Sequence, residues 1–371
     1  MPQKTVAIAI NTSWNIYNFR LGLIDALQEA GYHVVAVAPR DAYTEKIERH
    51  GIDYHAIEMH NKGTNPFEDL KLIYDFWKRY KEIDADVILH YTIKPNIYGS
   101  IAAWMLGIPV INNISGLGTV FLREGFSSKI ARLLYRIALK IPKKVFFQNR
   151  YDRNLFIEKG LVAAQKSDLL PGSGIDTHKF KPRSQNCKHK KVIRFLFIGR
   201  LLKDKGLEEF VYAAKKVSSH VAKFYVLGEY YPGNPTAITP KTMHQWEEEH
   251  TIEYIGASDD VASVLAQYDC VVLPSYREGL SRVLLEAASM EKPIITTNVP
   301  GCREVVEHGV NGYLCKPRDI DSLAEQMENM IHLSQEKCRE MGKRGREKVM
   351  HEFEEKLVID KYREAILEAM Q

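Results

Sequence analysis

The chain has 371 residues, of which 45% are apolar and 26% are charged, a composition that is typical of globular proteins and argues against a long disordered region. The net charge of +4 and the pI near 8.6 are too mild to indicate a nucleic-acid-binding protein. There is no signal sequence and no run of about 18 apolar residues, so we expect a cytoplasmic protein without a spanning helix. At roughly 100–200 residues per domain, the length predicts two domains.

In the first half of the chain, short apolar runs alternate with longer amphipathic stretches. Such alternation predicts a parallel sheet that is covered on both faces by helices. The polar, aromatic segment 11–20 lacks the G-x-G-x-x-G pattern of dinucleotide-dependent dehydrogenases, and we expect it to form a loop. Strands are expected at 5–10, 33–38, 52–57, 87–90, 110–114 and 145–148, and helices at 20–30, 67–80 and 97–106.

The alternation pauses over 169–191, a stretch with several Gly, Pro and basic residues that we predict to be a linker. Beyond it, strands are expected at 194–198, 223–227, 252–255, 270–273, 293–296 and 312–314, and helices at 206–218, 261–266, 281–290, 301–307 and 320–333. We therefore predict an N-terminal domain over 1–172, a C-terminal domain over 173–352 and a helix over 353–371 that crosses back to the first domain.

The first candidate site follows the strand at 194–198. Ligands of parallel α/β sheets bind beyond the carboxyl ends of the strands, so the residues that follow each strand are the first candidates. Gly199 permits a tight turn there, and Arg200 and Lys205 stand just before a helix. Two cations in this place are suited to a diphosphate, because Arg can make a forked contact and Lys adds a point charge.

The second candidate site follows the strand at 270–273. Glu278 lies in a turn, and Gly279, Leu280 and Ser281 lead into a helix whose first N–H groups can hold phosphate oxygens. Glu286 stands about two helical turns later, where a carboxylate can accept hydrogen bonds from a ribose diol. We interpret the acidic pair 259–260 as a helix N-cap rather than a metal site.

These motifs resemble those of the family 4 retaining glycosyltransferases. The segment 278–286 matches the E-x7-E motif of that family, and Gly199-Arg200 with Lys205-Gly206 matches its donor-phosphate motif. Segments 170–182 and 300–312 resemble its linker and its late loop–helix segment. The resemblance implies the GT-B fold, an α/β architecture of two Rossmann-like domains whose parallel sheets face a central cleft.

The family's roles can be carried over residue by residue. Glu278 would contact the transferred sugar at the reaction centre, Glu286 would hold the ribose, and Arg200 with Lys205 would neutralise the leaving diphosphate. Members often carry a functional His in the loop after the strand at 87–90. We predict His90 as that catalytic residue, while Lys94 is the alternative basic residue of the same loop.

The first half is expected to bind the acceptor. Segments 16–20, 65–67, 116–118 and 273–278 resemble bacterial enzymes that extend undecaprenyl-diphosphate-linked sugars, among them the N-acetylgalactosaminyltransferases of protein N-glycosylation and capsule-type transferases. This implies a lipid-linked acceptor in the membrane. Asn18, Arg20 and Lys94 are the predicted acceptor-binding residues, and the two cations would meet the lipid diphosphate.

A basic amphipathic helix is expected over 123–144. Apolar residues recur at helical spacing, and seven Lys or Arg residues surround them with a single acid. Such a helix can lie on an anionic membrane surface, although a helix packed on the core with a solvated basic face has the same pattern. We expect a peripheral protein on the inner face of the cytoplasmic membrane.

We therefore predict a retaining glycosyltransferase that moves a hexosyl or N-acetylhexosaminyl group from a UDP-sugar to a polyprenyl-diphosphate-linked saccharide, in the biosynthesis of a bacterial glycoprotein, capsule or O-antigen. The resemblance implies neither a metal nor another cofactor. Two alternatives remain open: a UDP-sugar epimerase of the same fold, and a non-catalytic protein that binds sugar nucleotides.

Overall fold

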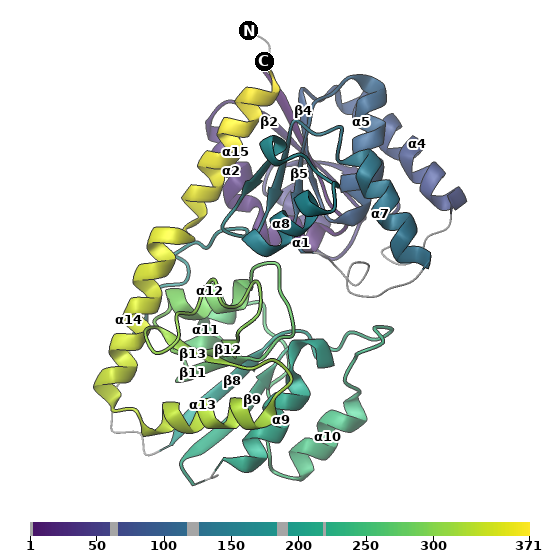
Figure 1. The fold of residues 1–371 in the computed structure, drawn as a ribbon. Helices are drawn as coiled ribbons and strands as arrows, with labels where there is room; N and C mark the ends of the chain where they lie inside the picture. Colours follow the sequence, from purple (N-terminus) through teal and green to yellow (C-terminus); the bar gives the residue numbers. More distant parts are fainter. Residues whose placement is uncertain (1–2, 60–65, 117–125, 184–191, 218–219) are drawn as a thin grey trace. The chain divides into compact units, whose positions relative to one another are not determined.

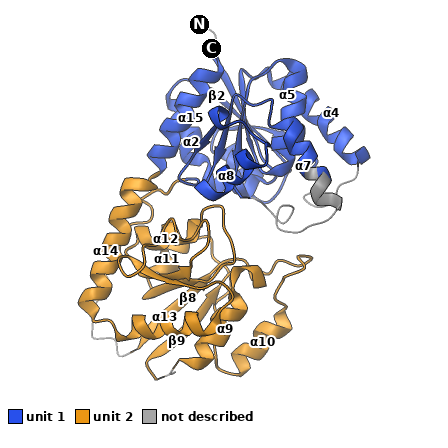
Figure 2. Cartoon of the chain, viewed as in Figure 1, with its two compact units in different colours: residues 1–173, 355–371 blue, residues 174–354 orange. Residues whose placement is uncertain are grey.

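The computed structural model describes residues 3–59, 66–116, 126–183, 192–217 and 220–371 (Figure 1). The chain forms two compact units, one of residues 1–173 with 355–371 and one of residues 174–354 (Figure 2). The boundaries expected from the sequence, after 172 and 352, lie one and two residues before these.

The first unit contains a parallel seven-stranded sheet in the order β3-β2-β1-β4-β5-β6-β7. Its strands are β1 (Thr5–Ala9), β2 (His33–Ala38), β3 (Asp53–Ala56), β4 (Val87–Tyr91), β5 (Val110–Ile114), β6 (Lys144–Phe147) and β7 (Ser167–Leu169). Its helices are α1 (Ser13–Phe19), α2 (Leu21–Glu29), α3 (Thr44–Arg49), α4 (Pro66–Ile83), η1 (Pro95–Gly99), α5 (Ser100–Leu106), α7 (Phe126–Ala138), α8 (Arg150–Glu158), η2 (Ala164–Lys166) and α15 (Glu355–Ala369).

Side-chain alternation along the strands divides the core of the first unit into two layers. Ala7 and Ala9 of β1 face a cluster that includes residues of α4 and α5, whereas Val6 and Ile8 face a cluster with residues of α2 and α15. Successive strand residues point to opposite faces, so a strand that is apolar throughout needs cover on both sides. The C-terminal helix α15 therefore completes one layer of the first unit.

The second unit contains a parallel six-stranded sheet in the order β10-β9-β8-β11-β12-β13. Its strands are β8 (Ile193–Ile198), β9 (Ala222–Leu227), β10 (Glu253–Tyr254), β11 (Cys270–Leu273), β12 (Ile294–Thr297) and β13 (Gly312–Cys315). Its helices are η3 (Lys203–Lys205), α9 (Leu207–Lys216), α10 (Pro240–Glu248), α11 (Val261–Leu265), α12 (Arg282–Ser289), α13 (Ile320–His332) and α14 (Gln335–Glu352).

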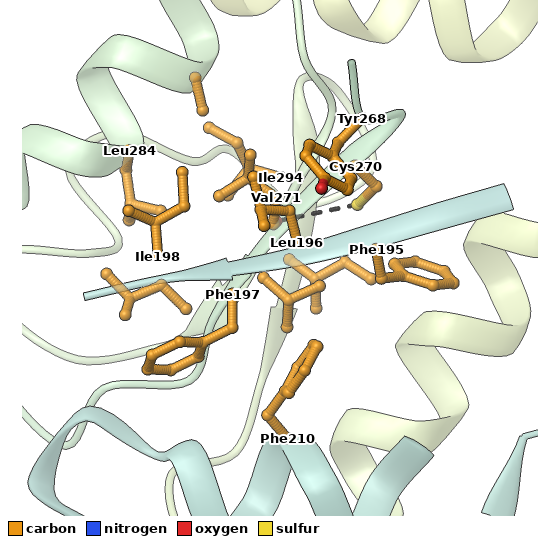
Figure 3. Packing of buried hydrophobic residues seen from close by; sticks show 14 of the residues in the cluster. Phe195, Leu196, Phe197, Ile198, Phe210, Tyr268, Cys270, Val271, Leu284 and Ile294 are labelled. Atoms are coloured by element: carbon orange, nitrogen blue, oxygen red, sulfur yellow. Dashed lines mark hydrogen bonds between the residues drawn. The ribbon is translucent and has the colours of Figure 1, made fainter. Parts of the chain in front are cut away.

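Strand β8 lies in the middle of the core of the second unit. Phe197 packs against Phe210 of α9 with ring centroids 5.7 Å apart, and Leu284 of α12 belongs to the same buried cluster (Figure 3). Burial of each such large side chain stabilises the fold by about 1.5–3 kcal/mol. The packing fixes where β8 ends and where α12 begins, and the candidate donor residues lie at these two points.

The two sheets share one strand order. The second and third strands of each unit lie on one side of its first strand, and the fourth and later strands lie on the other side. The reversal lies between β1 and β4 in the first unit and between β8 and β11 in the second. Ligands of such sheets bind at the carboxyl side of this point. Each unit therefore has one preferred place for a ligand.

Two of the expected elements are wrong. Segment 11–20 is largely helix α1 rather than a loop, because the Thr12 hydroxyl accepts the Asn15 N–H and caps its first turn. Segment 301–307 is a run of turns rather than a helix, since Gly301 has φ of 83°, which no helix accommodates. Strand β7 and helices α3, α8, α10 and α14 have no counterpart among the expected elements.

Within the described ranges, every helix is too short or too polar to span a lipid bilayer.

Candidate functional site

The loops that follow β8 and β11 are joined to each other in the second unit. The Tyr276 N–H donates to the Asp204 carbonyl over 3.0 Å, so the two loops share a backbone bond. Gly206 has φ of 76°, and a Cβ there would lie 2.1 Å from the Pro274 carbonyl oxygen. Only glycine fits this approach, so the Lys205-Gly206 pair places the lysine against the second loop.

Lys205 and Glu278 form an ion pair across these two loops. The Lys205 Nζ lies 2.5 Å from Glu278 Oε1, and the two side chains are 19% and 13% exposed. A close pair with little solvent is stronger than one on an open surface. The structure thus brings together one predicted diphosphate contact and the predicted catalytic acid, at the reversal point of the sheet.

The segment around Pro300 supports the turn that carries Glu278. The Glu278 N–H donates to the Pro300 carbonyl over 3.1 Å, and the Ser281 N–H donates to the Gly301 carbonyl over 2.8 Å. A Cβ on Gly301 would lie 2.4 Å from the Glu278 carbonyl oxygen. The motif expected to be a loop and helix is therefore a glycine turn that fixes the backbone of Glu278 and Ser281.

Glu286 lies on helix α12, which begins only at Arg282, so Glu278 precedes the helix and does not share its surface. Arg282 Nε donates to Glu286 Oε1 over 3.0 Å. Glu286 is 7% exposed, and this burial raises the pKa of its carboxyl group, while the charge and hydrogen bond of Arg282 oppose the rise. The pair keeps a nearly buried carboxylate on the helix that follows the Glu278 turn.

The other predicted donor residues differ in exposure. The exposed Arg200 lies with its guanidinium 5.1 Å from the ring centre of Tyr231, and no acid within the described ranges pairs with it. The Gly199 N–H donates to the Leu227 carbonyl, which ties the turn to β9. Leu280 packs partly on the core, Gly279 is half-buried, and the buried Ser281 is the N-cap residue of α12.

At the reversal point of the first unit, Arg20 lies between α1 and α2. It is 4% exposed, and its guanidinium carbon lies 4.1 Å from the ring centre of Tyr91, the last residue of β4. Its Nε is buried without a hydrogen-bond partner, and no carboxylate of the described ranges forms an ion pair with it. A buried cation in this state can attract an anion.

Two more buried groups near the carboxyl ends of β4 and β5 lack partners within the described ranges. The Asn113 side chain donates through Nδ2 to the Tyr362 hydroxyl of α15 over 2.8 Å, while its Oδ1 has no partner. The Tyr91 hydroxyl has no partner in good hydrogen-bond geometry, although its ring lies beside that of Tyr362. Buried polar atoms are nearly always satisfied in folded proteins. Unsatisfied polar groups beside Tyr91 are consistent with a polar ligand site at this edge.

The remaining two predicted acceptor residues already have partners in the protein. Asn18 Nδ2 donates to the Trp14 carbonyl one helical turn earlier, over 2.9 Å. Lys94 Nζ lies 3.5 Å from Asp69 Oδ1 of α4, and both side chains are largely buried, at 15% and 13% exposed. Among the predicted acceptor residues, Arg20 is thus the cation without an acidic partner in the described ranges.

His90 occupies a structural position, not the catalytic one predicted from the sequence. Strand β4 continues through it to Tyr91, and the imidazole is completely buried. Its Nε2 lies 2.8 Å from the Tyr80 hydroxyl, and its Nδ1 lies 3.0 Å from Asn112 Oδ1, so Nδ1–H donates and Nε2 accepts. Burial lowers the pKa of His90 to about 3 and keeps it neutral. A ring enclosed in this way does not reach a substrate.

The expected basic helix is shorter than 123–144. Helix α7 ends at Ala138, Lys140 follows in a turn, and residues 117–125, with Leu117, Gly118 and Arg123, lie outside the described ranges. Leu133 and Ile137 are 57% and 53% exposed, whereas Tyr135 and Ala138 are buried. The helix therefore presents apolar side chains to solvent next to the exposed Arg136 and Lys140.

Three residues of these sites, Arg282, Tyr91 and Tyr362, were not predicted from the sequence. Arg282 stands four residues before Glu286, and this spacing alone could have indicated the pair. No sequence signal connects Tyr362 to Asn113, since 249 positions separate them.

Asp260 does accept the Ser263 N–H, which confirms its predicted role as an N-cap. The described ranges hold no group of three or more His, Cys, Asp or Glu residues placed to bind a metal ion.

Comparison with known proteins identifies the class. Residues 179–348 match the family model of the glycosyl transferases group 1, and residues 6–149 match that of the glycosyl transferase 4-like proteins. Together with the two Rossmann-like sheets, these matches show that the chain belongs to the GT-B glycosyltransferases of this group. The resemblance predicted from the sequence is thereby confirmed.

Two curated relatives and one solved structure match most of the chain. The N,N'-diacetylbacillosaminyl-diphospho-undecaprenol alpha-1,3-N-acetylgalactosaminyltransferase of Campylobacter jejuni is 27% identical, with 94% of each chain covered. The UDP-Gal:alpha-D-GlcNAc-diphosphoundecaprenol alpha-1,3-galactosyltransferase of Escherichia coli is 25% identical, with 81% of this chain and 80% of the relative covered. Anabaena HepE, solved in complex with UDP-glucose, has a TM-score of 0.81 at 18% identity and covers 98% of this chain and 99% of its own.

Proposed function

We propose that this glycosyltransferase moves a hexosyl or N-acetylhexosaminyl group from a UDP-sugar to a polyprenyl-diphosphate-linked saccharide, with retention of configuration. Both curated relatives are named for undecaprenyl-diphosphate-linked acceptors, and HepE was solved with UDP-glucose. Such a reaction belongs to the assembly of a bacterial glycoprotein, capsule or O-antigen. A capsular polysaccharide glycosyltransferase of Staphylococcus aureus, 26% identical over 82% of both chains, is a further relative.

The Lys205–Glu278 pair is the observation that carries the donor half of this proposal. A diphosphate is a stronger partner for the Lys205 ammonium than a single carboxylate, because it carries more charge and more acceptor oxygens. On donor binding, Lys205 transfers to the diphosphate, and Glu278 is left beside the sugar. Arg200, which no described acid holds, and the first N–H groups of α12 add further contacts to the phosphates.

Charge develops on the leaving diphosphate during transfer, and fixed donors stabilise it. The bond between the anomeric carbon and the diphosphate oxygen breaks, and the acceptor hydroxyl oxygen bonds to that carbon on the same face. A phosphate oxygen of the departing UDP takes the hydroxyl proton. No carboxylate of the first unit is assigned as a covalent nucleophile, and neither a metal nor another cofactor has a role in this scheme.

The acceptor half depends on Arg20. A buried guanidinium with no carboxylate partner in the described ranges is costly unless an anion neutralises it, and the diphosphate of a lipid-linked acceptor is such an anion. Lys94 is a weaker candidate because it is paired with Asp69. Asn18 can offer hydrogen bonds to a sugar hydroxyl if its bond to Trp14 opens.

Helix α7 supports a peripheral position on the inner face of the cytoplasmic membrane. Exposed apolar side chains between basic ones are what an anionic bilayer surface binds. Helix α4 adds Phe67, Leu70 and Tyr74, exposed at 84%, 65% and 59% and spaced three and four residues apart. A lipid-linked acceptor would be met at such a surface.

A direct assay tests the proposed function. Purified enzyme is mixed with individual UDP-sugars and synthetic polyprenyl-diphosphate saccharides, and the product is analysed by mass spectrometry and by NMR of the new anomeric centre. We expect one hexosyl or N-acetylhexosaminyl unit to be added with the configuration of the donor. Free epimer formed without acceptor would favour the epimerase, and tight UDP-sugar binding without turnover would favour a non-catalytic sensor.

A further inference from the structure

The motif assignments give no role to the contacts of Arg282. Its Nε donates to Glu286 Oε1 over 3.0 Å, and its Nη1 donates to the Gly174 carbonyl over 3.2 Å. The side chain is 17% exposed and that of Glu286 is 10% exposed, so both contacts lie largely out of water. Charge-assisted hydrogen bonds of this kind are the strong ones in proteins.

Gly174 is itself held firmly. It begins the second unit, and the next residue, Ile175, donates its N–H to the Phe353 carbonyl over 3.0 Å. The Thr177 hydroxyl then donates to Glu354 Oε1 over 3.0 Å. The two segments by which the chain enters and leaves this unit are therefore bonded to each other, and Arg282 is anchored on one of them.

We propose that Arg282 is a positioning residue for donor binding: it fixes the Glu286 carboxylate, through its anchor on the Gly174 carbonyl, in the orientation that accepts the ribose hydroxyls. This inference rests on the proposed function, because it presumes a ribose at Glu286. A carboxylate has two acceptor oxygens. Arg282 donates to Oε1, and Oε2 is then the oxygen that would accept from the ribose.

Arg282 also keeps Glu286 in the form that accepts hydrogen bonds. Burial raises the pKa of Glu286, whereas Arg282 and, more weakly, Lys179 from the segment after Gly174 lower it. Without Arg282 the carboxyl group would hold its proton to a higher pH and would offer one acceptor fewer to the ribose. Arg282 thus favours ribose binding in two ways, by orienting the Glu286 carboxylate and by keeping it ionised.

The test compares two nucleotides that differ only at the ribose. Binding of UDP and of 2′-deoxy-UDP is measured by calorimetry, without acceptor or turnover, for the full-length wild type, Arg282→Met, Arg282→Lys and Glu286→Gln. We expect Arg282→Met to weaken UDP binding about tenfold or more, as the loss of a charge-assisted bond implies, and to weaken 2′-deoxy-UDP binding far less. Arg282→Lys should recover part of the loss.

The preference of Arg282→Met for UDP over 2′-deoxy-UDP should also increase as the pH is raised, while that of Glu286→Gln should stay low and constant.

Arg344→Met is the matched control, since Arg344 pairs with Glu340 over 2.7 Å at the same spacing on exposed α14, and it should bind both ligands normally. An equal loss for both nucleotides in Arg282→Met and Arg282→Lys would overturn the inference alone. No UDP binding by the wild type would overturn the proposed function as well.

Discussion

The reversal points of the two sheets differ in how their charges are balanced. Between β8 and β11, the cation Lys205 already contacts the acid Glu278, and nearby Arg282 contacts Glu286. Between β1 and β4, Arg20 is buried against an aromatic ring without an acid from the described ranges. In the first arrangement, the diphosphate of a bound nucleotide would replace Glu278 as the partner of Lys205. In the second, the ligand itself would supply the anion for Arg20. The same strand order thus supports two different modes of anion recognition.

The largest expected effect lies at the donor edge. Glu278→Gln should reduce transfer by roughly 10²–10³-fold, the usual cost of losing one preorganised electrostatic group, because the sugar loses the acid at its reaction centre. Steady-state rates and a thermal melt are the measurements, and Glu248→Gln on exposed α10 is the control. Near-normal turnover by a folded Glu278→Gln protein would remove Glu278 from the mechanism.

Arg20 tests the other side of the comparison. Arg20→Met should lower kcat/KM for a polyprenyl-diphosphate acceptor by about 10–100-fold, as the loss of a buried charged contact implies, and leave UDP binding unchanged. Arg40→Met is the control, since Arg40 also lies near a tyrosine ring but is exposed and paired with Glu48. A loss of UDP binding, or an unchanged kcat/KM for the acceptor, would contradict the assignment of Arg20 to the acceptor.

His90 should affect stability rather than chemistry. His90→Leu leaves the Tyr80 hydroxyl and Asn112 buried without their partner, which costs about 1–3 kcal/mol of unfolding free energy. Below its melting temperature the variant should keep near-normal kcat. Denaturant unfolding checks this, with exposed His351→Leu as control. A stable His90→Leu protein with abolished transfer would restore the catalytic role predicted from the sequence.

The same histidine predicts a pH dependence. Its pKa is about 3 in the folded protein and 6.5 in the unfolded chain, so the unfolded chain binds more protons between these values. Stability should therefore fall as the pH drops from 6.5 towards 3, by at most about 1.4 kcal/mol per pH unit from this group. The slope should be smaller in His90→Leu, and an identical slope would show that His90 is accessible in the native state.

The smallest effect per residue is expected at the basic residues of helix α7 and of the turn that follows it. Neutralising Lys129, Arg132, Arg136 and Lys140 should weaken binding to anionic liposomes by about 1 kcal/mol, or roughly fivefold, for each charge. Neutralising four exposed bases of α14, Lys337, Arg339, Lys343 and Arg344, is the matched control and should change little. Equal losses in both sets would indicate unspecific charge attraction. Salt-sensitive binding that persists after the first four charges are neutralised would reject this region as the membrane contact.

The amino-acid sequence by itself determined the α/β class, the positions of most central strands and the local motifs of the donor site. Apolar runs indicate buried strands directly, and Gly199, Lys205, Glu278 and Glu286 lie within short segments whose residue pattern can be recognised locally. The helix expected at 301–307 was wrong for a related reason: its helical pattern was local, but the loop that carries Glu278 requires a glycine turn at Gly301.

Only the tertiary structure decided which charged groups pair and which stay unpaired. His90 follows an apolar run like a ligand-facing residue, yet β4 extends by one residue and directs the ring into the core. The Arg20 guanidinium packs on the Tyr91 ring, and Arg282 donates to the Gly174 carbonyl, 108 positions away in the sequence. Burial and long-range contacts set the energy of a charge, and neither can be derived from the residues beside it in the chain.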